Sequence, residues 1–212
     1  MAGNSEIIDI IDQKADHTDE VALKVVENPE LLHIILEGLS AEIPRVKFRS
    51  AKILRIISEE DPDLLYPKID VFLELLDTDN SIILWNDLDI IANLTSVDDV
   101  HRFDEVYEKY YHFLEDASMV TAAHVVDNSA KIALNRPDLQ DKITEKLLKV
   151  YETPLGTECR DILSGKVLLA FTKYFDVIKN KDEVISFAEK QRDSKRNSTK
   201  VKAEKFLKKF KD

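Results

Sequence analysis

The hydrophobic positions that follow Leu65 return with the period of an α-helix. A polar turn signal, DTDN, ends this segment, and the next one, residues 81–95, is apolar over most of its circumference. A helix with one apolar face lies at a surface, whereas a helix that is apolar nearly all round packs between neighbours. The pattern therefore predicts an outer helix, a turn and an inner helix. The apolar face of the outer helix comprises Leu65, Ile69, Phe72, Leu73 and Leu76.

A short phrase recurs along the chain. SAKILRIISEEDPDLL begins at Ser50 and SAKIALNRPDL begins at Ser129. Comparable helix centres occur at Ala22, Ala51, Leu88, Ala130, Gly165 and Ala203, at intervals that average about 36 residues. A fixed interval of this size is typical of solenoids built from helical pairs, in which each unit packs against its neighbours.

Each small-residue helix is followed by a break that contains Pro or Asp. The breaks read ENPELL, EEDPDLL, SVDDV, NRPDLQ and KNKDEV. Proline in a first helical turn loses no hydrogen bond, and Asp or Asn caps a helix, so a new helix is expected after each break. We predict an all-α fold without sheet: a single domain over residues 1–212, forming an α-solenoid, a right-handed superhelix of about six antiparallel helical pairs. The inner helices are expected near residues 18–27, 44–58, 81–96, 118–135, 157–175 and 196–211.

The segment LLYPKIDVFLELLDTDNSIILWNDLDIIANL resembles a HEAT-like or armadillo-type repeat. In such repeats a first helix, a short Asp-containing turn and a second helix with a small central residue recur and stack. The resemblance covers almost the whole chain and is most specific to small archaeal HEAT-like proteins. It implies a binding scaffold.

Composition and charge narrow the classes of function. The 212 residues are 44% hydrophobic and 33% charged, which suffices for a sizeable core, and no apolar run approaches the roughly 18 residues that cross a bilayer. The acidic start, MAGNSEIIDIIDQKAD, lacks the features of a signal peptide. We therefore expect a cytoplasmic protein without a membrane partner. The net charge of −11 disfavours nucleic acid, although basic residues outnumber acidic ones ten to three from Lys190 onward, which marks either a site for an anionic partner or a solvated helix face.

The sequence holds little sign of catalysis. It contains no glycine-rich phosphate loop, HExxH or GxSxG, and its five histidines fall in separate segments without ligand spacing. Cys159 is the only cysteine, which excludes an internal disulfide; we expect a buried thiol rather than a nucleophile. We predict no enzyme activity, no catalytic residue, no cofactor and no metal.

Polar stripes on the inner helices are the candidate partner-binding site. Asparagine side chains both donate and accept hydrogen bonds, so a ladder of them can hold the main chain of an extended peptide. ANL at Asn93 resembles the asparagine ladder of armadillo peptide binders. The alternative is that polar stripes on solvated helices need no ligand. The candidate residues are Arg45, Arg49 and Lys52; Asn86, Asp89 and Asn93; and His124, Asn128, Lys131 and Asn135.

Aromatic residues crowd the segment 103–113. Phe103, Tyr107 and Tyr110 share a stripe and are assigned to the core, whereas Tyr111 is a candidate for exposure at an interface. Trp85 is either an interface anchor or buried between its apolar neighbours.

Two classes of function follow. The favoured one is a non-catalytic scaffold for a protein or an extended peptide. The alternative is nucleic-acid binding or DNA repair, resembling HEAT-like proteins that remove alkylated bases. Asp89 opposes this alternative because it would face phosphate in a DNA-binding groove.

Overall fold

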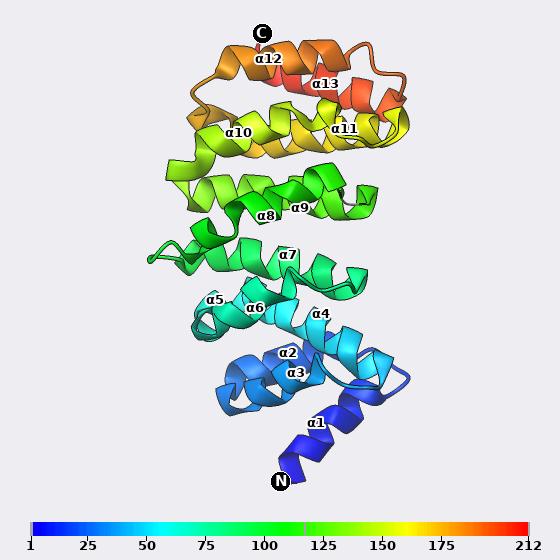
Figure 1. Cartoon of the computed structure of the whole chain (residues 1–212), viewed down its shortest axis with the longest axis vertical. Helices are drawn as coiled ribbons and strands as arrows, with labels where there is room; N and C mark the ends of the chain where they lie inside the picture. The colour runs from blue at the N-terminus through cyan, green and yellow to red at the C-terminus, as the bar shows by residue number, and fades with distance from the viewer. Residues whose placement is uncertain (1, 117, 212) are drawn as a thin grey trace. The chain divides into compact units, whose positions relative to one another are not determined.

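A computed structural model describes residues 2–116 and 118–211 of the chain, and the side chains of residues 6–115 and 118–211 (Figure 1). The chain divides into two compact units, residues 1–103 and 104–212, each of which is described by itself. All regular elements within the described residues are helices, as the sequence predicts.

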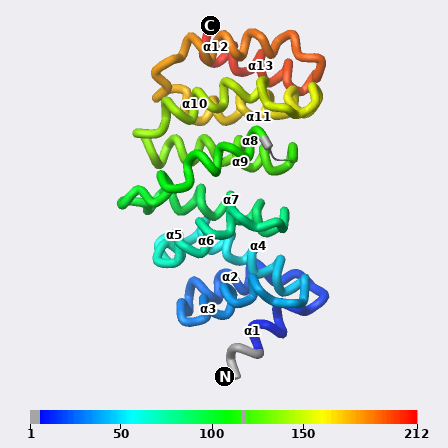
Figure 2. Tube along the Cα trace, in the orientation of Figure 1, coloured from blue at the N-terminus to red at the C-terminus, as the bar shows by residue number. Residues whose placement is uncertain are grey.

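In the first unit, helix α4 is central. It packs against α2 and α7 and also contacts α1, α3 and α5, while α6 packs against α7. The chain can be followed through these helices in Figure 2. The inner helices of this unit are therefore α2, α4 and α7. The helices are α1 (Ala2–Asp12), α2 (Thr18–Glu27), α3 (Leu32–Gly38), α4 (Pro44–Glu60), α5 (Pro62–Leu65), α6 (Ile69–Leu75) and α7 (Ser81–Leu94), with 3₁₀ turns at Pro29–Leu31, Tyr66–Lys68 and Thr95–Val97.

In the second unit, α11 packs between α9 and α13. The outer helices α8 and α10 lie against α9, and α12 lies against α13. None of the described helices is both long enough and apolar enough to span a bilayer. The helices are α8 (Tyr107–Asp116), α9 (Met119–Asn135), α10 (Gln140–Leu148), α11 (Thr157–Tyr174), α12 (Lys181–Gln191) and α13 (Asn197–Phe210), with 3₁₀ turns at Pro137–Leu139, Val150–Glu152 and Phe175–Val177. A further 3₁₀ turn, Arg102–Glu105, spans the boundary between the units.

Capping residues mark the starts of three inner helices. Pro44 occupies the first turn of α4. The Asn80 side chain accepts hydrogen bonds from two backbone amides in the first turn of α7, and Ser118 caps α9 in the same way through the amide of Thr121. The six predicted inner helices correspond to α2, α4, α7, α9, α11 and α13, and each ends within one turn of its predicted bounds.

Small residues allow neighbouring helices to approach closely. A Cβ added to Gly38 on α3 would overlap the Ser50 hydroxyl on α4, and one added to Gly165 on α11 would lie 2.9 Å from Thr199 Oγ1 on α13. Both glycines are buried. Here glycine is required by the distance between helices rather than by backbone conformation.

The aromatic core of the second unit corrects one prediction. Tyr111 is 0% exposed, although the sequence suggested a surface position. It follows Tyr107 by one helical turn, and their ring centroids lie 4.9 Å apart, so the two side chains share the face of α8 that packs against α9. Burial raises the pKa of the Tyr111 hydroxyl. Tyr110 is buried as predicted, and Trp85 is half-buried.

Candidate binding surface

The predicted basic residues of α4 bind the connection between α1 and α2. The guanidinium of Arg49 donates to the backbone carbonyls of Ile11, at 2.7 Å, and Gln13, at 2.6 Å. Residues 13–17 form no helix, so their carbonyls are available as acceptors. Arg49 therefore holds the main chain of a non-helical segment, the interaction expected for a bound peptide, but within its own chain.

Two acidic side chains, one at the end of α1 and one in the connection, pair with the other two basic residues. Arg45 lies 3.2 Å from the Asp12 carboxylate, and Lys52 lies 2.9 Å from the Asp16 carboxylate. The hydrogen bond from Lys52, followed by those from Thr18, holds the pKa of Asp16 well below its usual range. The basic stripe of α4 is thus an internal example of an inner helix that binds carboxylates and main-chain carbonyls, at the end of α1 and in the non-helical connection after it.

Replacing Arg49 by alanine is expected to lower the free energy of unfolding by about 1 to 2 kcal/mol, because hydrogen bonds made by charged donors each contribute about this much. Faster hydrogen exchange in α1 should accompany the loss. The control is Arg55→Ala, which removes only an exposed pair with Glu59 on the same helix. Equal losses in urea unfolding of the two variants would show that Arg49 does not anchor the connection.

Replacing Asp16 by asparagine is expected to destabilise the protein more at neutral pH than in acid. Because the folded-state pKa is lowered, the carboxylate contributes stability above the unfolded pKa of about 3.9, and this contribution is lost as the pH falls further. The side chain is 53% exposed, so screening limits the effect to about 1 kcal/mol or less. Urea unfolding at about pH 7 and about pH 3 measures it, with Asp9→Asn as control. A deficit that persists unchanged in acid would refute the assignment.

The asparagine ladder is largely buried, contrary to the prediction. Asn93 is 4% exposed and its amide donates to Ser58 Oγ on α4 at 2.8 Å, while Asn128 is 7% exposed. Asn86 is half-buried and donates to the Ile82 carbonyl of its own helix. Because inner helices are covered on several sides, an amide with a partner on the next helix is accommodated inside. Asn93 and Asn128 are therefore not available to a ligand main chain.

The other predicted residues lie nearer the surface. Lys131 is exposed, whereas Asp89, His124 and Asn135 are half-buried. On α9 the solvent-facing positions are spaced three and four residues apart, which defines one narrow stripe. This stripe contains Val120, His124, Asp127, Lys131 and Leu134. It shares His124 and Lys131 with the predicted stripe, but Asp127 and Leu134 take the places of Asn128 and Asn135.

A matching stripe on α11 was absent from the prediction. It contains Ile162, Lys166, Leu169 and Lys173, and the residues between Asp161 and Phe171 that lie outside this stripe are buried. The ammonium of Lys166 lies 2.5 Å from the Asp127 carboxylate, which joins the stripes of α9 and α11. The sequence contains a signal that marks Lys166, because this lysine directly follows the small central residue Gly165.

That signal is a three-residue motif that recurs in α4, α9 and α11 as SAK, SAK and SGK. In each copy the serine is buried, as is the small residue after it. The lysine that follows lies at the edge of the solvent-facing stripe or within it. The three lysines are Lys52, Lys131 and Lys166. The repeated phrase therefore combines close helix packing with an outward-facing cation.

Lys202 extends this surface onto α13. A Cβ added to Gly165 would lie 3.3 Å from Lys202 Cδ and 3.5 Å from its Nζ, so the lysine lies across α11 where the glycine lacks a side chain. Desolvation, and then the nearby Lys166 and Arg196, lowers the pKa of Lys202. We define the inner strip as Asp127, Lys131, Leu134, Lys166, Leu169 and Lys202.

A groove of about 700 Å³ lies elsewhere in the second unit, along α8 and α10. Two ion pairs line this groove, since Lys149 lies 2.7 Å from Glu145 and Lys146 lies 3.0 Å from Glu108. The charges of these four side chains offset one another.

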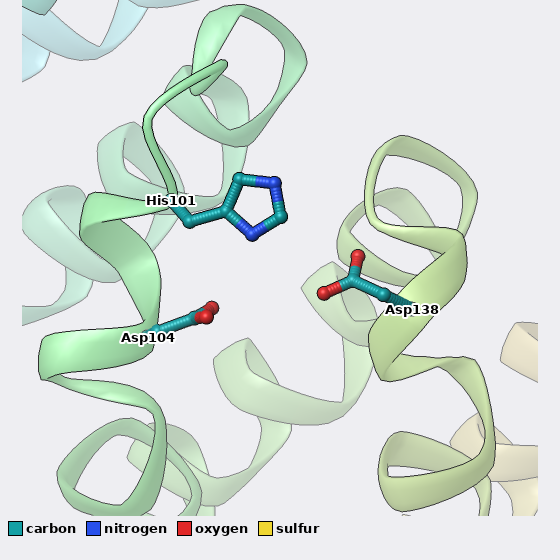
Figure 3. A group of neighbouring side chains, drawn as sticks. All are labelled: His101, Asp104 and Asp138. Carbon is teal, nitrogen blue, oxygen red and sulfur yellow. The ribbon is translucent and has the colours of Figure 1, made fainter.

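Figure 3 shows the carboxylates of Asp104 and Asp138 facing each other from two segments of the second unit. The buried guanidinium of Arg136 donates to both, at 2.6 and 2.7 Å. The hydrogen bond to Asp138, the larger cause, and that to Asp104 raise the pKa of Arg136. Arg136 therefore offsets part of the negative charge of these two carboxylates and holds them in place. Cys159, expected to be buried, is half-buried at the start of α11.

The comparisons with known proteins concern the fold. No family model and no curated protein matches the chain. Among solved structures, the designed armadillo repeat protein YIII(Dq)4CqI matches with a TM-score of 0.61 and 15% identity, over 96% of this chain and 98% of that one. The chain has an armadillo-type repeat fold. An engineered protein matches with a TM-score of 0.57 and 15% identity, over 100% of this chain and 97% of that one.

A further designed armadillo repeat protein, YIII(Dq.V1)4CPAF, was solved in complex with the peptide (KR)4. It matches with a TM-score of 0.57 and 15% identity, over 99% of this chain and 90% of that one. These similarities confirm the predicted all-α solenoid. The likeness to small archaeal proteins stays a prediction.

Proposed function

We propose that this armadillo-type chain is a non-catalytic cytoplasmic scaffold that binds an extended segment of a partner protein along the inner strip. The observation that carries the proposal is the exposure of two leucines beside the motif lysines. Leu134 is 50% exposed on α9 and Leu169 is 47% exposed on α11. Each follows its motif lysine by three residues, so the two helices present the same pair of side chains to solvent.

Lysines and leucines side by side suit a polypeptide ligand. The leucines offer apolar surface that a side chain can cover, and the lysines offer donors for carbonyl or carboxylate oxygens. The first unit supports the same chemistry, because α4 already holds residues 11–16 through carbonyls and carboxylates. The complex of a similarly folded designed protein with (KR)4 shows that a solenoid of this type accommodates a peptide.

The test uses three labelled peptides of equal length, built from repeats of Glu-Ser-Leu-Ser, Gln-Ser-Leu-Ser or Lys-Ser-Leu-Ser. Alternate residues of an extended chain point to the same side, so the charged or amide residue and the leucine face the protein together. Binding is measured by fluorescence anisotropy. We expect at least one peptide to bind and the variant with both Leu134→Asp and Leu169→Asp to lose about ten-fold or more in affinity.

The matched control is Leu23→Asp, which places an aspartate at a 55% exposed leucine on α2. It should melt and bind like the parent. If none of the peptides binds, or if the double variant binds as well as the control, the inner strip is not a polypeptide site.

Nucleic-acid binding is the second candidate function, because the last helix, α13, is basic. Lys205, Lys208 and Lys209 are exposed on α13. Their cations attract phosphate, whereas the net charge of −11 repels it over longer distances. Chromatography on heparin at moderate salt separates the two functions. We expect the protein to pass through, and retention would favour nucleic acid.

A further inference from the structure

Lys202 differs from its cationic neighbours in having no carboxylate within ion-pair distance. Lys166 pairs with Asp127 at 2.5 Å, and Arg196 lies 3.6 Å from the Glu158 carboxylate. Within the described residues, Lys202 forms no ion pair, although it is half-buried and lies across Gly165. The Asp127 carboxylate attracts Lys202 from a greater distance, but burial and the two cations outweigh this attraction. A bound anion would relieve the remaining cost of the half-buried ammonium.

Lys166, Arg196 and Lys202 form a cluster of cations. The carboxylates that pair with the first two do not neutralise all of its charge. The Asp127 side chain is 51% exposed and that of Glu158 is 82% exposed, so solvent already surrounds both carboxylates. Three cations thus lie close together on α11 and α13 with two acids at the rim. An incoming carboxylate can bind Lys202 without displacing either ion pair.

The chain itself provides a precedent for the ligand. Lys52, the motif lysine of α4, binds the Asp16 carboxylate of a non-helical segment at 2.9 Å, and Arg49 binds carbonyls of the same segment. Lys166 occupies the equivalent motif position on α11. A partner segment that carries a carboxylate would therefore repeat the contact that Lys52 makes with Asp16.

We propose that the inner strip is selective for acidic segments, with a glutamate or aspartate carboxylate of the partner bound by Lys202 beside Lys166 and an apolar side chain against Leu134 and Leu169. This inference rests on the proposed scaffold function and adds the chemical class of the partner. Such an acidic segment is opposite in charge to the (KR)4 peptide in the complex of the designed protein. Charge complementarity of this kind sets specificity and association rate more than total affinity.

The inference is tested with the Glu-Ser-Leu-Ser and Gln-Ser-Leu-Ser peptides, which have the same shape but differ in charge. The glutamate peptide should bind the parent about ten-fold more tightly than the glutamine peptide, because a hydrogen bond between charged groups is the stronger one. Lys202→Gln should abolish this preference and leave the affinity for the glutamine peptide unchanged. Lys190→Gln, on the exposed side of α12, is the control and should preserve the preference.

The outcomes separate the two proposals. Equal binding of the two peptides at the inner strip, or a preference for the lysine peptide, would overturn acid selectivity and leave the scaffold function standing. A preference that survives in Lys202→Gln would overturn the role of Lys202. Absence of binding by every peptide would overturn both proposals. Thermal melts of the variants ensure that a lost preference does not reflect lost folding.

Discussion

Replacing Phe171 by alanine is expected to lower the free energy of unfolding by about 3 to 5 kcal/mol, a large effect for one substitution. Phe171 is 0% exposed on α11, the helix that packs between α9 and α13. Its ring centroid lies 6.0 Å from that of Tyr174 and 6.0 Å from that of Phe187. Truncation removes these contacts and leaves a cavity that the packed helices cannot fill.

Urea unfolding monitored by circular dichroism measures the loss. The control is Val177→Ala, at a site that is 49% exposed, which should change the stability by about 0.5 kcal/mol or less. If Phe171→Ala and Val177→Ala unfold at the same urea concentration, α11 is not the packed centre of the second unit.

Reversing two charges of the inner strip, with Lys166→Glu and Lys202→Glu together, is expected to weaken binding of the Glu-Ser-Leu-Ser peptide by about a hundred-fold or more. Each lost charged hydrogen bond accounts for about ten-fold, and repulsion adds to it. The reversal also breaks the pair between Lys166 and Asp127, so thermal melts accompany the anisotropy titration.

The control for this variant changes the net charge equally on an adjacent surface. Lys208→Glu with Lys209→Glu alters two exposed lysines of α13 outside the inner strip. It should weaken binding only through long-range charge, and the loss should disappear as added salt shortens the Debye length from about 10 Å. Equal losses in the two double variants would mean that net charge, not the inner strip, attracts the peptide.

The helical pairs could be predicted from the sequence because their signals are local. Pro44, Asn80 and Ser118 mark where helices begin, and the apolar period marks which side is covered. Such signals depend on residues within one or two turns of each other. Local signals therefore suffice to place the inner helices, without any knowledge of contacts between repeats.

Burial of polar and aromatic residues could not be predicted in the same way. Asn93 is inside because Ser58, on another helix, accepts its hydrogen bond, and Tyr111 is inside because α9 covers that side of α8. A polar or aromatic residue has the same spacing along a helix whether or not a neighbouring helix covers it. The predicted ladder therefore mixed buried amides with exposed cations.

Lys166 and Lys202 belong to the inner strip but not to the site predicted from the sequence, for two different reasons. Lys166 was predictable, because SGK repeats the SAK phrase already recognised at Lys52 and Lys131. Lys202 was not, because its place beside Lys166 depends on how closely α13 approaches Gly165. The repeat motif thus identifies the lysines of separate helices, and three-dimensional packing decides which of them act together.

The most direct test of the central claim is a methyl NMR titration with the Glu-Ser-Leu-Ser peptide. We expect the methyl resonances of Leu134 and Leu169 to shift as the peptide is added, while those of Leu148, which lines a groove between α10 and the start of α12, stay in place. Shifts at Leu148 with none at Leu134 and Leu169 would place the peptide outside the inner strip and contradict the account.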